Sequence, residues 1–311
     1  MVVQAAGSGA TSNGTTSNGA KIKMATSDVA TGNRTTGNGA TSRGPVLARK
    51  VLALLVAPVV IAAGIILYLY PSQTAQLFAW PIAPTMTPIV MGAGYLAAAW
   101  FFFSLWRARA WAHVAAVLSG IFVFTVVMMV STLLHWDRFS HGKFTFWLWL
   151  VVYVLSPFAV AGVIWLHRHH REPQIDTVIV GSVARGWFTL LFAAMAIVAL
   201  ALVLWPSSII GQWPWKLSPL TARVLGGWIA VLAVGGLQMC RSAQWLRWPV
   251  ALETGALWFS LIALALPGAR GDFASQQGFI GFATVLAVLW LSFVGMWIYY
   301  QRKTALKIMC R

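Results

Sequence analysis

The chain has 311 residues, of which 59% are hydrophobic and only 9% are charged, and its mean hydropathy is +0.76. A soluble domain carries roughly 25% charged residues because its surface meets water, so this composition excludes an ordinary soluble fold and indicates a membrane protein. The net charge of +16 does not indicate nucleic-acid binding, because the cations stand in small groups at the ends of apolar runs.

Residues 1–45 form a low-complexity segment rich in Gly, Ala, Thr, Ser and Asn. Such a segment has too little apolar surface to offset the entropy lost on ordering. We therefore predict a disordered tail. It also lacks the apolar core of a secretory signal peptide.

Eight apolar stretches come after the tail, each close to the ~20 residues that cross about 30 Å of hydrocarbon. They lie at about 47–69, 87–106, 111–134, 144–166, 186–205, 220–240, 248–267 and 279–300. Their apolar runs do not alternate as barrel strands do, and helices are the other way to satisfy the backbone in lipid. The sequence therefore predicts an all-α membrane protein with eight transmembrane helices.

The distribution of Lys and Arg predicts the orientation. With the amino terminus in the cytoplasm, 17 of the 22 cations lie on the inner side. The other five lie on the outer side: Arg138, Lys143, Lys216, Arg223 and Arg270. Because cytoplasmic loops carry the excess of Lys and Arg, we expect a cell-membrane protein with both termini in the cytoplasm.

The chain also contains an internal repeat. A shift of 135 residues aligns Trp80 with Trp215, Pro84 with Pro219, Gly92 with Gly227, Asp137 with Asp272 and Phe158 with Phe293. We predict two tandem four-helix repeats, 46–170 and 185–311, joined by a cytoplasmic linker at 171–184. Because each repeat has an even number of spans, both should have the same orientation, related by an axis along the membrane normal.

Two outer loops share a candidate binding pattern, a cation two residues before an aspartate. The pairs are His135 with Asp137 and Arg270 with Asp272. They could pair with each other or bind a polar ligand. Alternatively, each aspartate caps a turn while the cation anchors at lipid headgroups.

Two of the charged residues within the predicted spans are further candidates. Glu253 is the only acid there, and an intramembrane carboxylate suggests a proton or cation site. Its structural alternative is a pair with Arg241, Arg247 or His113. Arg223 could hold an anionic group, or its side chain could extend to the interface.

The loops before the second and sixth spans are rich in Trp and Pro, including Trp80-Pro81 and Trp213-Pro214-Trp215. They predict either interfacial anchoring or a groove for a hydrophobic ligand.

No motif indicates catalysis, a metal or a cofactor. The chain lacks Cys-x-x-Cys, Gly-x-Ser-x-Gly and His-Glu-x-x-His. The cluster from His167 to Arg171 includes two arginines, which disfavour a cation, and reads better as a basic flank that meets anionic lipid. Haem would need facing core histidines, which the spans do not offer.

The segment from Phe78-Ala79-Trp80-Pro81 to Gly94-Tyr95-Leu96, with His135-Trp136-Asp137-Arg138-Phe139 and Tyr153-x-x-x-Pro157, resembles uncharacterised bacterial membrane proteins built from one or two four-helix units. The resemblance covers residues 67–166 well and 202–300 less well, where Arg270 replaces His135 and Ser292 replaces Pro157. It implies a multi-pass inner-membrane location and transfers no functional residue.

These features are compatible with three functional hypotheses. The first is a non-enzymatic binding or scaffold protein whose partners are the lipid bilayer and another membrane protein or a second copy of itself. The second is a transporter for a small or hydrophobic solute that uses Glu253 with Asp137 and Asp272. The third is a membrane redox or enzyme subunit.

Overall fold

The computed structural model describes residues 37–168 and 178–309, without the side chains of 37–43 and 308. The helical bundle lies within residues 41–311. Most of the predicted tail therefore lies outside the described residues, as do His169, His170 and Arg171. Residues 37–45, assigned to the tail by sequence, are already helical, since each residue added to an existing helix gains a backbone hydrogen bond.

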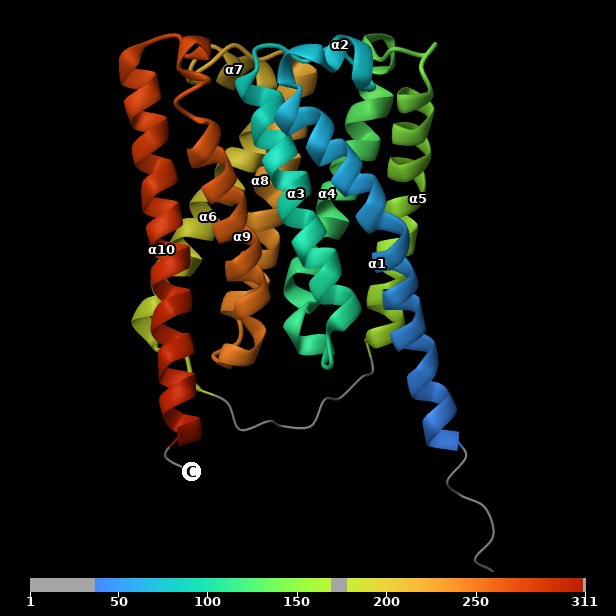
Figure 1. Ribbon diagram of the computed structural model, residues 1–311, viewed down its shortest axis with the longest axis vertical. Coiled ribbons are helices and arrows are strands. Elements are labelled where there is room, and N and C mark those ends of the chain that lie inside the picture. Colours follow the sequence, from blue (N-terminus) through green and yellow to red (C-terminus); the bar gives the residue numbers. More distant parts are fainter. Residues whose placement is uncertain (1–36, 169–177, 310–311) are drawn as a thin grey trace, which may run out of the picture. The chain divides into compact units, whose positions relative to one another are not determined.

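The described residues from 41 onward form an all-helical bundle whose long helices lie roughly along one common axis, up and down in turn (Figure 1). The described residues contain no β-strand, which confirms the predicted all-α class. The long helices are α1 (Gly37–Leu69), α3 (Met86–Arg107), α4 (Ala115–Leu134), α5 (Phe144–His167), α6 (Ser182–Leu204), α8 (Pro219–Cys240), α9 (Pro249–Ala265) and α10 (Gln276–Met309). The short ones are η1 (Pro71–Gln73), α2 (Thr74–Leu77), η2 (Trp111–His113), η3 (Trp136–Arg138), α7 (Pro206–Ile210), η4 (Trp245–Arg247) and η5 (Arg270–Asp272). We call the end that carries α2 and α7 the upper end, as in Figure 1.

Seven helices among the described residues are long and apolar enough to cross a membrane, so the protein is a multi-pass membrane protein. The eighth predicted span is α9, an apolar helix of 17 residues. At 1.5 Å per residue it is about 25 Å long, slightly less than the hydrocarbon thickness. Pro249 occupies its first turn and Pro267 comes after its end, and proline cannot continue a helix at that point.

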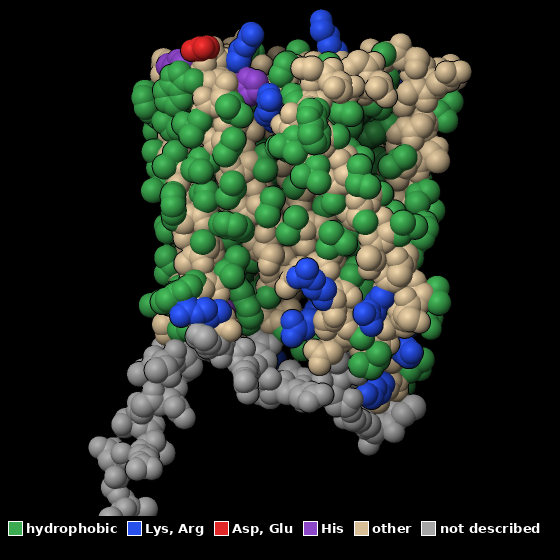
Figure 2. Space-filling view, turned by 180° about the vertical axis from the view of Figure 1, so that it is seen from behind, with side chains coloured by type: hydrophobic (Ala, Val, Ile, Leu, Met, Phe, Trp, Pro, Cys, Tyr) green, Lys and Arg blue, Asp and Glu red, His purple; other side chains and the backbone are tan. Residues whose placement is uncertain are grey.

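Helices α3, α4 and α8 form the most buried part of the bundle. α8 packs extensively on α6 and α4, and α9 packs on α3 and α10. In their most apolar windows α3, α4 and α8 bury 61%, 50% and 67% of their residues, against 28% or less for α1, α5, α6 and α10. The peripheral helices therefore present apolar side chains outward. Hydrophobic side chains cover the middle of the face in Figure 2, and most Lys and Arg side chains lie toward its two ends.

Several contacts of the first half recur in the second half. At the upper end, a backbone bond from Ser140 N to Ala79 O matches one from Ala274 N to Pro214 O, both 2.9 Å. At the lower end, a ring stack of Trp111 on His167 matches one of Trp245 on Tyr300, with centroids 4.1 and 5.1 Å apart. Close helix approaches recur as well: Gly92 lies against Leu67 and Tyr68, and Gly226 lies against Leu202 and Val203.

These contacts relate the halves by a shift that changes along the chain. It is 135 residues for α1 and α6, 134 for α3 and α8, and 133 for α5 and α10. Gly92 thus corresponds to Gly226 instead of Gly227. Phe158 is 70% exposed and Phe293 only 1%, so Phe293 corresponds instead to the buried Val160. Short length differences in the connecting loops, which tolerate them, account for the change.

The described part of the predicted linker begins at Val178 and is tied to the loop between α8 and η4. Val180 N donates to Ala243 O at 2.7 Å, and Trp245 N donates to Val178 O at 2.9 Å. This segment therefore packs against the lower end of the second half.

Candidate functional site

Glu253 lies in the second turn of α9 and is held by two indole groups. Trp297 Nε1 of α10 donates to Oε1 at 3.0 Å, and Trp100 Nε1 of α3 donates to Oε2 at 3.2 Å. The side chain is half-buried between three helices. Both carboxylate oxygens therefore have a donor, which lowers the cost of placing this acid in an apolar layer.

The guanidinium groups expected near Glu253 bind elsewhere. Arg241 donates to Gln238 Oε1 at 2.6 Å, and Arg247 donates to Gln244 Oε1 at 3.4 Å. Each arginine thus binds a glutamine that lies three residues before it in the chain. The indoles are the partners that the sequence did not reveal, because they lie 153 and 44 residues away along the chain.

Asp272 caps a helix of the other half of the chain. Its Oδ2 accepts hydrogen bonds from Met86 N and Thr85 Oγ1, both at 2.6 Å. Thr85 itself makes no side-chain cap to α3. The carboxylate therefore satisfies the first backbone N–H of α3 and lies at the positive end of that helix.

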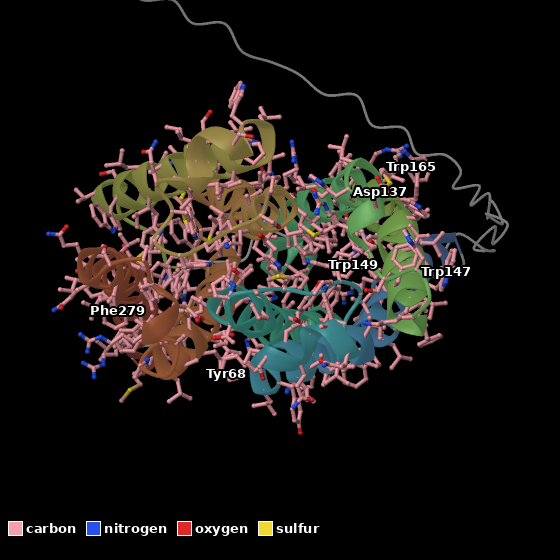
Figure 3. The ribbon with its side chains drawn as sticks, turned by 90° about the horizontal axis from the view of Figure 1, so that it is seen from above. Tyr68, Asp137, Trp147, Trp149, Trp165 and Phe279 are labelled. Carbon is pink, nitrogen blue, oxygen red and sulfur yellow. The ribbon has the colours of Figure 1, made fainter. Side chains whose placement is uncertain are left out.

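Asp137 does not make the corresponding contact. It is exposed, and its carboxylate has no hydrogen-bond or ion-pair partner among the described residues. Helix α8, which it would cap by analogy, is capped by its own Ser218 and Thr221. Arg270 lies over the ring of Phe279 at 5.3 Å, and Figure 3 shows Phe279 and Asp137 on opposite sides of the upper end. The two outer loops therefore do not meet.

His135 and Arg223 form a pair at the upper end. The Nε2 atom of His135 accepts from the Arg223 guanidinium at 2.7 Å, and Arg223 Nε donates to Val203 O at 3.1 Å. Burial, Arg223 and Arg138, in that order, lower the pKa of His135 below its usual value. The imidazole is thus neutral near pH 7, and the pair ties α8 to α6 and to the end of α4.

Apart from the His135–Arg223 pair, the six candidate residues do not contact one another through their side chains and do not build one site. The residues that the structure describes contain no group of three or more His, Cys, Asp or Glu that could hold a metal ion. His167 is buried, stacks on Trp111 and contacts Val163 O through Nδ1 at 2.8 Å. That histidine is part of the packing at the lower end.

One feature suited to a ligand is a cavity of about 520 Å³ in the second half, which we call the α6–α10 cavity. This volume lies in the range of small-molecule sites. Its walls come from α6, α8, α9, α10 and the Trp213–Trp215 loop, with Val90 from α3. No side chain with a charge or a hydroxyl lines it among the described residues.

The α6–α10 cavity opens sideways, toward the surface that faces lipid. The exposed residues on its wall belong to the two peripheral helices: Ala194 and Val198 on α6, and Gly281 and Val285 on α10. The wall residues of α8 and α9 are mostly buried, among them Trp228 and Phe259. A molecule can therefore enter between α6 and α10 without crossing a polar surface.

Smaller side chains explain why this space opens in the second half. In the first half, Tyr95 and Tyr153 are buried and their hydroxyl oxygens lie 2.6 Å apart. At the shifts given above, their counterparts are Ile229 and Leu286, and Gly281 stands where the first half has Leu148. Ile, Leu and Gly are smaller than Tyr, Tyr and Leu, and close packing makes such differences in side-chain volume matter.

A smaller cavity of about 110 Å³ lies at the centre of the bundle, lined by both halves. It contains the Tyr95–Tyr153 pair together with Thr125 and Ser156. Trp228, Leu232 and Trp258 line both cavities and form the wall between them.

Sequence reasoning found one part of this site. The Trp213-Pro214-Trp215 loop, a possible ligand groove from its composition, lines the α6–α10 cavity. The other residues of the cavity wall could be found from sequence only by comparing the two halves for positions at which the second half has the smaller side chain. No protein family, curated protein or solved structure matches this chain, so its function has to be inferred from its own geometry.

Proposed function

We propose that this chain is a non-enzymatic membrane protein that binds a hydrophobic molecule taken from the bilayer. Its binding site is the α6–α10 cavity. The observation that supports this most is the combination of an apolar wall with exposed lining residues on α6 and α10. Lipid reaches such an opening directly, and burial of a hydrocarbon in a wall of matching chemistry is favoured by close packing.

The architecture that we propose is eight membrane-spanning helices in two tandem four-helix repeats of the same orientation. The recurring contacts at both ends of the bundle support it. The packing between the halves supports it as well, because α4 of the first half packs on α8 of the second, and α9 of the second packs on α3 of the first. Helix α9 then crosses the bilayer with help from the turn at 266–268. The cavity becomes a feature of the second repeat alone.

Both termini lie in the cytoplasm in this proposal, because 17 of 22 cations are then on the inner side. The upper end faces outward. A single cysteine at the exposed Gln212 should react with a membrane-impermeant thiol reagent on intact cells, and one at Lys307 should react only after lysis. The reverse pattern would contradict the orientation.

Filling the cavity tests the proposed function. A Cβ at Gly281, on the cavity wall, would have no heavy atom within 4 Å, so Gly281→Phe should occupy the opening without disturbing the fold. Gly295 on the same helix has equally open surroundings but does not line the cavity, which makes Gly295→Phe a matched control.

We expect Gly281→Phe to reduce binding of a radiolabelled long-chain alkane to the purified protein at least tenfold, while Gly295→Phe binds as the unmodified protein does. Saturable binding that is equal in the two variants would place the ligand elsewhere. Absence of saturable binding in the unmodified protein would contradict the proposed function.

A further inference from the structure

We propose that the upper end of the protein carries a binding site for the phosphate group of a membrane lipid, built from Arg223, His135 and Arg138. None of these residues lines the α6–α10 cavity, so this site is separate from the proposed ligand site and does not depend on it. The inference comes from a positive charge that the protein fixes in place and does not neutralise.

Arg223 is held in one position by two neutral acceptors. Its Nε donates to Val203 O at 3.1 Å, and its guanidinium donates to His135 Nε2 at 2.7 Å. The side chain is therefore half-buried between the last turn of α6 and the end of α4. An arginine that only anchors a helix at the headgroups extends its side chain to the interface, whereas this one is tied to the protein.

The charge of Arg223 has no counter-ion in the part of the chain that the structure describes. Both of its acceptors are neutral, and no described carboxylate bonds to it. A guanidinium has five N–H donors, so these two contacts leave three of them unused. Partial burial of an unpaired charge is costly. An anion with several acceptor oxygens, such as a phosphate, would supply both the missing charge and the missing acceptors.

A second arginine adds to the positive potential at this place. Arg138 lies in η3, three residues after His135, and it is exposed. Arg223 and Arg138 both contribute to the lowered pKa of His135, after burial, so both guanidinium groups lie close to this imidazole. Asp137 is the acid nearest to them in the sequence, and its carboxylate contacts neither arginine. Cationic and histidine side chains gather at the upper end of the face in Figure 2.

The surroundings of the site favour a lipid over a soluble phosphate. Leu134, the last residue of α4, is 62% exposed, and Leu204, the last residue of α6, is 54% exposed. One turn further down, Val130 and Leu200 are exposed as well, and residues four apart lie on the same face of a helix. Acyl chains therefore have apolar strips to contact on both helices that hold Arg223, while the phosphate reaches the guanidinium groups.

His135 makes binding depend on pH. The charged groups that act on it are Arg223 from α8 and Arg138 from η3, and α6 contributes only the Val203 carbonyl to the cluster. Burial and these two cations keep the pKa of His135 below its usual value. A bound phosphate brings negative charge beside the imidazole and raises this pKa. The bound state therefore takes up a proton more readily than the free state, and affinity for phosphate rises as the pH falls.

The test measures binding of three probes to the full-length protein purified in detergent: dioctanoyl phosphatidylglycerol, dioctanoylglycerol and inorganic phosphate. An excess of the long-chain alkane is present throughout, so that the α6–α10 cavity does not contribute. We expect the phosphatidylglycerol to bind roughly tenfold or more tightly than either other probe, because charge-assisted hydrogen bonds are the strong ones. Equal binding of dioctanoylglycerol would overturn the phosphate site. Equal binding of inorganic phosphate would overturn the lipid as its ligand.

Variants with one cation less locate the site. Arg223→Gln should weaken phosphatidylglycerol binding roughly tenfold and Arg138→Gln roughly threefold. Lys216→Gln is the matched control, because Lys216 is exposed in the loop before α8 and its loss changes the net charge equally. The same loss of binding in all three variants would reduce the effect to general surface charge and overturn the site. Arg138 bonds to no other described side chain or backbone group, so its variant serves even if Arg223→Gln fails to fold.

The pH profile tests the part played by His135. A phosphodiester keeps one negative charge between about pH 5.5 and about pH 8, so a change of affinity over this range comes from the protein. Affinity should rise as the pH falls. His135→Gln keeps an acceptor for Arg223 and does not titrate, so its profile should be flat. His141→Gln should keep the pH dependence, because His141 packs on Trp136 and Phe146 with ring centroids 5.1 and 4.7 Å apart. A flat profile in the unmodified protein, or an unchanged one in His135→Gln, would contradict the role of His135.

Discussion

Several polar side chains inside this bundle bind across the boundary between the two halves of the chain. Asp272 accepts from Thr85 and Met86. The hydroxyl of Tyr68 donates to Leu261 O at 2.8 Å, and the indole of Trp258 donates to Val90 O. Because lipid offers no competing hydrogen bonds, these few contacts fix how the halves meet.

The outer aspartates provide a matched test of this view. Asp272→Ala removes the acceptor for the first N–H of α3 and should lower the free energy of unfolding by about 1 kcal/mol, as the loss of other helix caps does. Asp137→Ala should change it little, because Asp137 is exposed and has no partner among the described residues. Denaturant unfolding in detergent measures both. An equal effect, or a larger one for Asp137, would contradict the capping role.

Residue types that are rare in a span could be identified from sequence, and their partners could not. Glu253 stood out as the only acid in an apolar run, yet its two indole partners belong to helices whose packing the sequence does not specify. The aspartates were recognised as a pair related by the repeat, but one caps a helix and the other is exposed. That difference depends on Ser218, which supplies its own cap to α8.

At the scale of elements, the helices were largely predictable. Apolar length predicted α3, α5 and α8 to within one or two residues at each end, because the bilayer sets how long an apolar helix must be. The ends of α9 depend on two prolines, and the changing shift between halves depends on loop lengths. Neither the ends of α9 nor the changing shift can be seen in a hydropathy profile, because prolines and short insertions change the average hydropathy of a window very little.

The cavity could not be predicted at this scale. It arises where two helices of the same repeat, α6 and α10, do not close on each other over a stretch lined by Ala194, Val198 and Gly281. Each of these residues looks like an ordinary small or aliphatic residue of a span. The open space is visible only from the packing of the helices in three dimensions. Comparison with the aromatic residues of the first half shows it as well.

At the scale of the whole molecule, the two four-helix units that we propose differ in how they are filled. The first unit is packed by Tyr95, Tyr153 and an aromatic cluster around Trp80 and Trp149. The second has the aliphatic Ile229 and Leu286 in place of the two tyrosines, an aromatic cluster that includes Trp215 and Phe282, and a lateral opening. We infer that the first unit provides rigidity and the second provides the ligand site.

Photolabelling in a lipid bilayer tests the proposed ligand site most directly. The protein is reconstituted with a photoactivatable long-chain hydrocarbon, and labelled residues are mapped by mass spectrometry with and without an excess of an unlabelled long-chain methyl ester as a hydrophobic competitor. We expect labels at Ala194, Val198 and Val285 that the ester suppresses, and labels at the equally lipid-exposed Leu54 and Leu155 that it does not. Uniform labelling of all these positions, unaffected by the ester, would contradict a specific ligand site between α6 and α10.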